Sequence, residues 1–75
     1  MKNITVYTNT GCSKCAMLKR WLTMKELDYD ELNIGENQEA RNLLISKGLR
    51  SLPQVAIGDE IVSFKEYNEL LELIK

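Results

Sequence analysis

The chain has 75 residues, of which 44% are hydrophobic, and its formal net charge is -1. This length allows one domain, residues 1–75, with a modest core. The near-neutral charge gives no reason to expect nucleic acid or an anionic membrane as a partner. No apolar run approaches the roughly 20 residues of a membrane span or forms a signal peptide. We therefore expect a soluble, cytoplasmic protein that works as a monomer.

The first third of the chain predicts a strand, a helix and a second strand. Residues 2–8 are short, apolar and rich in β-branched side chains, which favours a buried strand. After a turn, apolar residues recur at spacings of three and four, and this predicts a helix over residues 13–25. Partial alternation of apolar and polar residues predicts a strand over 28–34, which Gly35 ends.

A second helix is predicted over residues 37–47. Asn37 is a suitable cap for its start, and Gly48 is a suitable residue to end it. Two short strand-like runs follow at 54–57 and 60–62. The Gly58-Asp59 pair between them suits a tight turn, so these two strands should pair antiparallel.

The last helix is predicted over residues 64–74, where Ser63 and Glu66 stand at the spacing of a capping box. The resulting order is β-α-β-α-β-β-α. A helix that connects two neighbouring strands makes them parallel, whereas the hairpin adds antiparallel strands. The sequence therefore predicts an α/β fold in which three helices flank a mixed sheet of four strands.

Cys12 and Cys15 are the only cysteines of the chain, and Ser13 and Lys14 separate them. The spacing disfavours a structural disulfide, because a bridge across three residues closes too small a loop to add much stability. Small secreted scaffolds also carry four or more cysteines as a rule. The pair instead indicates a site of thiol and disulfide exchange.

The positions of the two cysteines predict different roles. Cys12 lies at the predicted start of a helix, where backbone N–H groups, the helix dipole and the nearby Lys14 favour a thiolate. Such a setting lowers the pKa of a cysteine from about 8.5 into the range of ~3.5–7.5. Cys15 lies on the apolar helix face and should be more buried. We predict that Cys12 attacks a substrate disulfide and that Cys15 then releases the reduced substrate, leaving a Cys12–Cys15 disulfide.

Three other readings of the pair remain open but are less favoured. Two small buried hydrophobic residues would account for Cys15 but not for Cys12, which is not on the apolar face. A structural zinc site needs four ligands, and the chain has no histidine and no further cysteine. Hydrolysis by a cysteine nucleophile lacks a histidine base. We therefore predict no bound metal and no bound cofactor.

Two segments resemble the thioredoxin superfamily, and within it the glutaredoxins and the glutaredoxin-like NrdH redoxins. The first runs from Val6-Tyr7-Thr8 to Gly11-Cys12-Ser13-Lys14-Cys15, and the second is Ser51-Leu52-Pro53-Gln54-Val55. The resemblance implies a thioredoxin-like, glutaredoxin-type fold in which Pro53, in a cis peptide bond, lies beside the cysteines. It also implies that the backbone of Leu52 pairs with bound substrate.

The stretch Gly48-Leu49-Arg50-Ser51-Leu52-Pro53 is most similar to the NrdH-type redoxins. This resemblance implies recharging by thioredoxin reductase and electron delivery to a disulfide-containing protein, ribonucleotide reductase. The alternative is a glutaredoxin with glutathione as co-substrate, although Ser63-Phe64 stands where glutaredoxins hold the glutathione carboxylate with two glycines. A noncatalytic glutaredoxin-like carrier of metal or an iron-sulfur cluster is a third possibility.

Trp21 is expected to pack in the core, because it lies on the apolar stripe of the first helix. The candidate site residues fall into two groups. The catalytic pair is Cys12 and Cys15. The predicted substrate-binding residues are Gly11, Ser13, Lys14, Arg50, Leu52, Pro53, Ser63 and Phe64.

Overall fold

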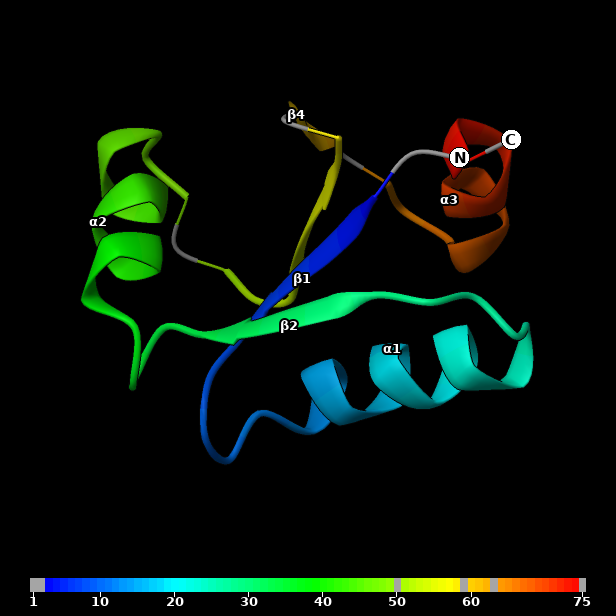
Figure 1. The fold of residues 1–75 in the computed structure, drawn as a ribbon, viewed down its shortest axis with the longest axis horizontal. Coiled ribbons are helices and arrows are strands. Elements are labelled where there is room, and N and C mark those ends of the chain that lie inside the picture. The colour runs from blue at the N-terminus through cyan, green and yellow to red at the C-terminus, as the bar shows by residue number, and fades with distance from the viewer. Residues whose placement is uncertain (1–2, 50, 59, 63, 75) are drawn as a thin grey trace.

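The computed structural model of the chain describes residues 3–49, 51–58, 60–62 and 64–74. The elements follow one another in the predicted order (Figure 1). They are β1 (Ile4–Thr8), α1 (Ser13–Met24), β2 (Asp30–Asn33), α2 (Gln38–Ser46), β3 (Gln54–Ile57), β4 (Glu60–Val62) and α3 (Tyr67–Ile74).

The strands form one mixed sheet in the order β2-β1-β3-β4. Strand β1 pairs in parallel with β2, and it pairs antiparallel with β3, where Val6 lies opposite Val55. Strands β3 and β4 form an antiparallel hairpin, and Gly58 in its turn has a φ of 66°. The predicted thioredoxin-like topology is thereby confirmed. Two predicted positions, residue 2 of the first strand and Asp59 of the turn, lie outside the described residues.

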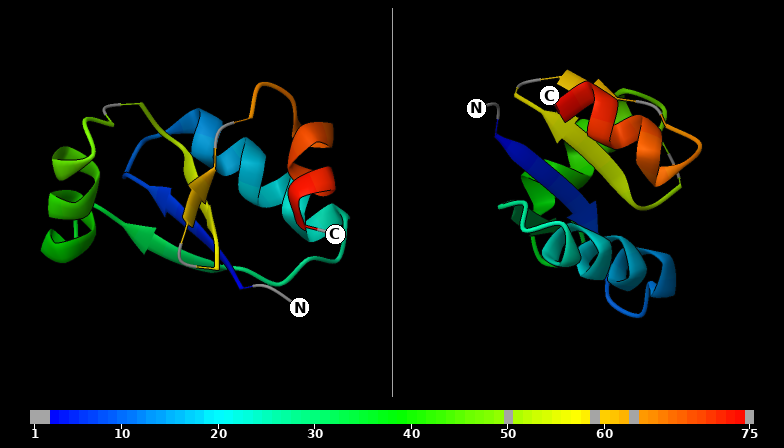
Figure 2. Two further views of the ribbon diagram at one scale, coloured as in Figure 1. Left: turned by 90° about the horizontal axis from the view of Figure 1, so that it is seen from above. Right: turned by 90° about the vertical axis from the view of Figure 1, so that its right-hand side faces the viewer.

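The sheet buries both of its faces. Alternation along β1 directs Ile4 and Val6 to one face, where they pack with Leu18 of α1 and Leu70 of α3. Tyr7 lies on the other face, in a second cluster with residues of α2. Figures 1 and 2 show the same division, with α2 on one side of the sheet and α1 and α3 on the other. The start of α1 follows the carboxyl end of β1, one of the two inner strands of the sheet.

Helices α1 and α2 end in the same way. In α2, Gly48 has a φ of 71°, and Leu49 donates its N–H to the carbonyl of Leu44 at 2.9 Å. After α1, Glu26 takes the left-handed conformation with a φ of 58°, and Leu27 donates its N–H to the carbonyl of Leu22 at 3.0 Å. Both are Schellman motifs, which satisfy the last carbonyl groups of a helix and favour glycine at the left-handed position.

The start of the last helix differs from the prediction. Helix α3 begins at Tyr67, whereas the sequence predicted a start at residue 64. The carboxylate of Glu69 accepts the backbone N–H groups of Lys65 and Glu66 at 2.6 and 3.0 Å, so the chain turns once more before the helix begins. Glu69 therefore performs the capping that was predicted for Glu66, and Ser63, the other half of the predicted box, lies outside the described residues.

The remaining helix start agrees with the prediction. The side chain of Asn37 accepts the N–H of Ala40 at 3.0 Å and caps α2. Strand β2 is shorter than the predicted 28–34. Among the described residues, no helix has the length and apolar character needed to cross a membrane.

Candidate active site

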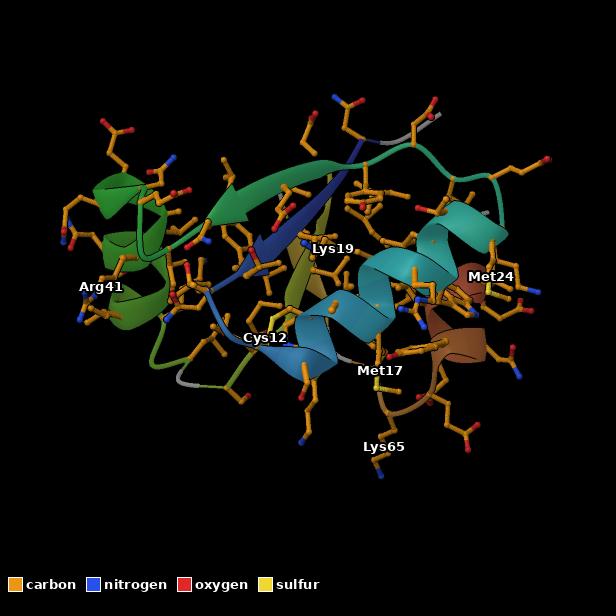
Figure 3. All side chains as sticks on the ribbon, turned by 90° about the horizontal axis from the view of Figure 1, so that it is seen from below. Cys12, Met17, Lys19, Met24, Arg41 and Lys65 are labelled. Carbon is orange, nitrogen blue, oxygen red and sulfur yellow. A yellow bond between two sulfur atoms is a disulfide. The ribbon has the colours of Figure 1, made fainter. Side chains whose placement is uncertain are left out.

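Cys12 and Cys15 form a disulfide at the start of α1, with their Cα atoms 5.2 Å apart (Figure 3). The loop that leads from β1 to this disulfide contains Gly11, whose φ is 77°. A Cβ atom at position 11 would meet nothing within 4 Å beyond its chain neighbours, so the requirement for glycine comes from the backbone conformation alone. The loop thereby brings the chain from the end of β1 directly into the redox pair.

The sulfur of Cys12 caps helix α1. Cys12 has an extended backbone, and its Sγ accepts the backbone N–H of Cys15 at 3.2 Å. This is the position that serine, threonine, asparagine or aspartate fills in most helices. A hydrogen bond to the sulfur and the positive end of the helix dipole both stabilise negative charge on Cys12 when the disulfide is reduced.

The two cysteines differ in their access to solvent. Cys15 is only 2% exposed, and it lies on the buried face of α1 with Leu18 and Leu22. Cys12 is partly exposed at the start of α1. A partner that approaches from solvent therefore reaches Cys12 before Cys15.

The peptide bond between Leu52 and Pro53 is cis, as the resemblance implied. These two residues line an open groove of about 780 Å³ that also borders α1 and the segment before α3. In Figure 3, Met17 and Lys65 extend on the side of the molecule where Cys12 begins α1. The described lining residues are Lys14, Met17, Ser51, Leu52, Pro53, Gln54, Val62, Phe64, Lys65, Glu66 and Tyr67.

A second cavity, of about 510 Å³, borders the disulfide from the side of β2. Its lining includes Gly11 and Ser13, two of the predicted substrate-binding residues, together with both cysteines. Glu31 and Lys19 lie at the same cavity, and their charged groups form an ion pair at 3.0 Å.

Glu31 belongs to a small polar network that sequence reasoning missed. Its carboxylate accepts hydrogen bonds from Lys19 and from the hydroxyl of Thr8, the latter at 2.8 Å. These bonds, the one from Lys19 first, hold the pKa of Glu31 below its ordinary value of 4.5. Thr8 is 1% exposed, so its hydroxyl needs such a partner. The sequence signal for this network was a threonine in the last position of a buried strand, just before the cysteine loop, because its hydroxyl needs a hydrogen-bond partner.

The other predicted site residues are placed as follows. Lys14 is exposed at the edge of the groove, and Phe64 forms part of its wall, with its ring centroid 6.4 Å from that of Tyr67. Trp21 packs against the core and against Tyr67 at 5.1 Å, as predicted. Arg50 and Ser63 lie outside the described residues. Within the described ranges there is no cluster of three or more side chains suited to a metal ion.

The comparisons with known proteins agree with this geometry. The family model described as Glutaredoxin matches residues 4–62. The glutaredoxin-like protein NrdH of Lactococcus lactis subsp. lactis (strain IL1403) is 36% identical over 70 residues, which are 93% of this chain and 97% of that protein. N-acetyl-S-hydroxy-L-cysteine reductase of Bacillus subtilis (strain 168) is 33% identical over 57 residues, 75% of this chain and 61% of that protein.

Among solved structures, the glutaredoxin-like protein NrdH-redoxin from Escherichia coli superposes with a TM-score of 0.82 at 31% identity. The match covers 95% of this chain and 93% of that one, and the E. coli protein is described as having a thioredoxin-like activity profile. Proteins of this family that carry two cysteines at this spacing act as thiol-disulfide oxidoreductases. The chain therefore belongs to the glutaredoxin family, as a redoxin similar to NrdH with Cys12–Cys15 as its redox-active disulfide.

Proposed function

We propose that this redoxin reduces disulfides in partner proteins, that thioredoxin reductase recharges it, and that ribonucleotide reductase is its target. The observation that carries the proposal is the unequal access to the two sulfurs, with Cys12 partly exposed and Cys15 2% exposed. The NrdH relatives and the thioredoxin-like activity profile of the E. coli protein support the choice of reductant. Such a donor works in a reducing compartment, the cytoplasm.

In the proposed cycle, the Cys12 thiolate attacks one sulfur of the substrate disulfide. The other substrate sulfur leaves with the bonding electron pair and takes up a proton, and Cys12 is left in a mixed disulfide. The Cys15 thiol then loses its proton and attacks the Cys12 sulfur, which releases the second substrate thiolate. The two electrons that reduce the substrate come from the cysteine pair, and thioredoxin reductase restores them.

The groove of about 780 Å³, whose α1 wall includes Lys14 between the two cysteines, is the proposed docking site for the substrate chain. The backbone of Leu52, before the cis Pro53, would pair with an extended segment of the substrate chain. Phe64 offers an apolar wall and Lys14 a cation. Gly11 and Ser13 contact the partner beside the disulfide from the second cavity. Arg50 and Ser63 stay predicted contacts.

A glutathione-dependent glutaredoxin is the second candidate. The family model and the two lysine side chains at the groove, Lys14 and Lys65, favour it. The decisive experiment supplies the oxidised protein with NADPH and either thioredoxin reductase, or glutathione with glutathione reductase, and follows NADPH consumption. Turnover with thioredoxin reductase is expected, and turnover only in the glutathione system contradicts the proposal. Failure in both systems favours a noncatalytic carrier, which purification would reveal as a coloured or metal-containing protein.

Two variants test the roles of the cysteines. Cys12→Ser should abolish disulfide reduction, because the attacking sulfur is gone. Cys15→Ser should accumulate a mixed disulfide with the substrate, since no thiol remains to resolve it. Mass spectrometry of the Cys15→Ser reaction identifies the trapped species. Residual disulfide reduction by Cys12→Ser would contradict the assignment of roles.

A further inference from the structure

Two residues at the α3 end of the groove already bind a carboxylate through their backbone N–H groups. Lys65 and Glu66 line the groove, and their backbone N–H groups both donate to Oε2 of Glu69, at 2.6 and 3.0 Å. Glu69 is the third residue of α3, so its side chain reaches back over the start of its own helix. The N–H groups of Lys65 and Glu66 are therefore engaged within the protein.

Backbone N–H groups at the start of a helix form a general binding site for anions. Here the anion comes from the chain itself. The two backbone hydrogen bonds, that of Lys65 first, stabilise the charged carboxylate and hold the pKa of Glu69 below its ordinary value of 4.5. An internal group of this kind is also present at a high effective concentration, because the chain keeps it within reach.

This arrangement affects small ligands more than proteins. A small thiol that carries carboxylates has few groups with which to bind, and at this end of the groove it would compete with Glu69 for both N–H groups. The exposed carboxylates of Glu66 and Glu69 also repel it. The side chains of Lys14 and Lys65 attract any anionic partner, but exposed lysines are screened point charges and offer no fixed pair of donors.

We propose that Glu69 is a specificity-determining residue, whose carboxylate occupies the anion-binding N–H groups before α3 and disfavours small carboxylate-bearing thiols, such as glutathione, as reductants. The inference rests on the proposed function, because it takes the groove as the place where the reducing partner docks. Reduction by glutathione needs two of its thiols. The first breaks the Cys12–Cys15 bond and forms a mixed disulfide with Cys12, and the second releases oxidised glutathione and leaves the dithiol.

The test compares Glu69→Ala with the matched control Glu72→Ala, which removes an exposed carboxylate one turn further along the same helix. For each protein, kcat/KM is measured with glutathione and glutathione reductase, and separately with thioredoxin reductase. We expect the ratio of the glutathione value to the thioredoxin reductase value to rise about fivefold or more in Glu69→Ala, through a lower KM for glutathione. Glu72→Ala should leave the ratio unchanged.

A binding measurement separates recognition from chemistry. S-methylglutathione, which has no free thiol, is titrated into each ¹⁵N-labelled protein. In Glu69→Ala the amide signals of Lys65 and Glu66 should shift with the ligand, and in Glu72→Ala they should not. If Glu69→Ala does not fold, Glu69→Gln replaces it, because an amide oxygen can still accept the N–H groups but carries no charge. A smaller rise of the same ratio is then expected.

The outcomes for this inference and for the proposed function are distinguishable. A folded Glu69→Ala protein with the wild-type ratio and unshifted amide signals overturns the role of Glu69 while the function stands. A wild-type protein that turns over efficiently with glutathione also overturns it. Absence of wild-type turnover with thioredoxin reductase contradicts the proposed function itself, whatever Glu69→Ala does.

Discussion

Two sulfur atoms only three residues apart in the chain have different surroundings. Cys12 is partly exposed at the start of α1, whereas Cys15, one helical turn later, lies on the buried face of the helix and is 2% exposed. We therefore expect iodoacetamide to alkylate Cys12 of the reduced protein at least about tenfold faster than Cys15, because thiolate character and access together set the rate. Peptide mapping after short exposures measures both rates. Equal alkylation rates would mean that the position at the helix start does not make Cys12 more reactive than Cys15.

Glu31 is expected to contribute stability that depends on pH. Its pKa in the folded protein is lowered by Lys19 and Thr8, so its contribution is present above the ordinary value of 4.5 and is lost as the pH falls through the folded value. Glu31→Gln should therefore cost about 0.5 kcal/mol at neutral pH, as is usual for a partly exposed pair, and this cost should shrink as the pH falls below 4.5 through the folded pKa. Urea unfolding across this range measures the difference.

The control for Glu31 is Glu36→Gln, which removes an exposed carboxylate from the turn after β2. Its effect on the free energy of unfolding should not follow the same pH dependence. A difference between wild type and Glu31→Gln that stays constant down to about pH 2.5 would contradict the assigned role of the hydrogen bonds.

At the residue scale, the cysteines and Pro53 were predictable because their chemistry is rare in the chain. Proline is the only residue for which a cis bond is common, and two cysteines at this spacing have few uses. The partnership of Thr8 with Glu31 was not predictable in the same way. It joins residues 23 positions apart, and only the parallel pairing of β1 with β2 brings them together.

At the scale of elements, the ends of α1 and α2 are two copies of one motif with different residues at the left-handed position. Gly48 adopts its φ of 71° freely, whereas Glu26 holds a φ of 58° against the clash between Cβ and the backbone. Glu26→Gly should therefore raise the free energy of unfolding by about 1 kcal/mol, and Gly48→Ala should lower it by a similar amount.

Chemical denaturation of the two variants checks this pair, with Glu26→Ala as the control. Alanine removes the carboxylate but keeps Cβ, so Glu26→Ala should gain little. Added atoms at position 48 would meet nothing within 4 Å, so any loss in Gly48→Ala reports backbone strain. If Glu26→Gly is no more stable than Glu26→Ala, the charge of Glu26 rather than its conformation is responsible.

Element order and type followed from hydrophobic periodicity, because each helix and strand buries one face or both. The start of α3 was predicted wrongly for a physical reason. The Ser63 and Glu66 spacing fits a capping box, but Glu69 stands one turn later and can reach two backbone N–H groups. The sequence contains both possibilities, and the packing of the segment before the helix decides between them.

At the scale of the whole molecule, the groove exists only because three separate segments meet: the first turns of α1, the segment around Leu52 and Pro53, and the segment before α3. Met17 of α1 lines it and is 61% exposed, whereas Met24 is 71% exposed on the same helix and does not line it. Met17→Ala should raise the KM for a protein disulfide such as insulin about fivefold, because the apolar contact that this side chain would bury against the docked substrate is lost. Met24→Ala should leave this KM unchanged.

Both methionine variants are assayed with NADPH and thioredoxin reductase, and thermal melts check that each is folded. Because both side chains are largely exposed, neither substitution should affect stability much. An equal rise of KM in the two variants would contradict the assignment of the groove as the docking site for protein partners.

The thioredoxin-like architecture was predictable as a whole, whereas the shape and charge of the groove were not. A groove depends on how Met17, Leu52 and Phe64 approach one another from distant parts of the chain, and no local pattern encodes that distance. The same holds for the contacts of Lys65 and Glu66 with Glu69, on which the proposed preference between reductants rests.

The sulfur of Cys12 has two roles that oppose each other: it caps α1, and as a thiolate it gives up electrons to a substrate disulfide. As the cap of α1 it holds the N–H of Cys15, and a thiolate accepts that bond more strongly than a disulfide sulfur does. This hydrogen bond at the start of α1 is therefore stronger when the protein is reduced. Every gain of this kind stabilises the reduced form and makes the protein more reluctant to give its electrons away. A stronger hydrogen bond from the N–H of Cys15 to the sulfur of Cys12 would fix the helix start more firmly and make the protein a weaker reductant.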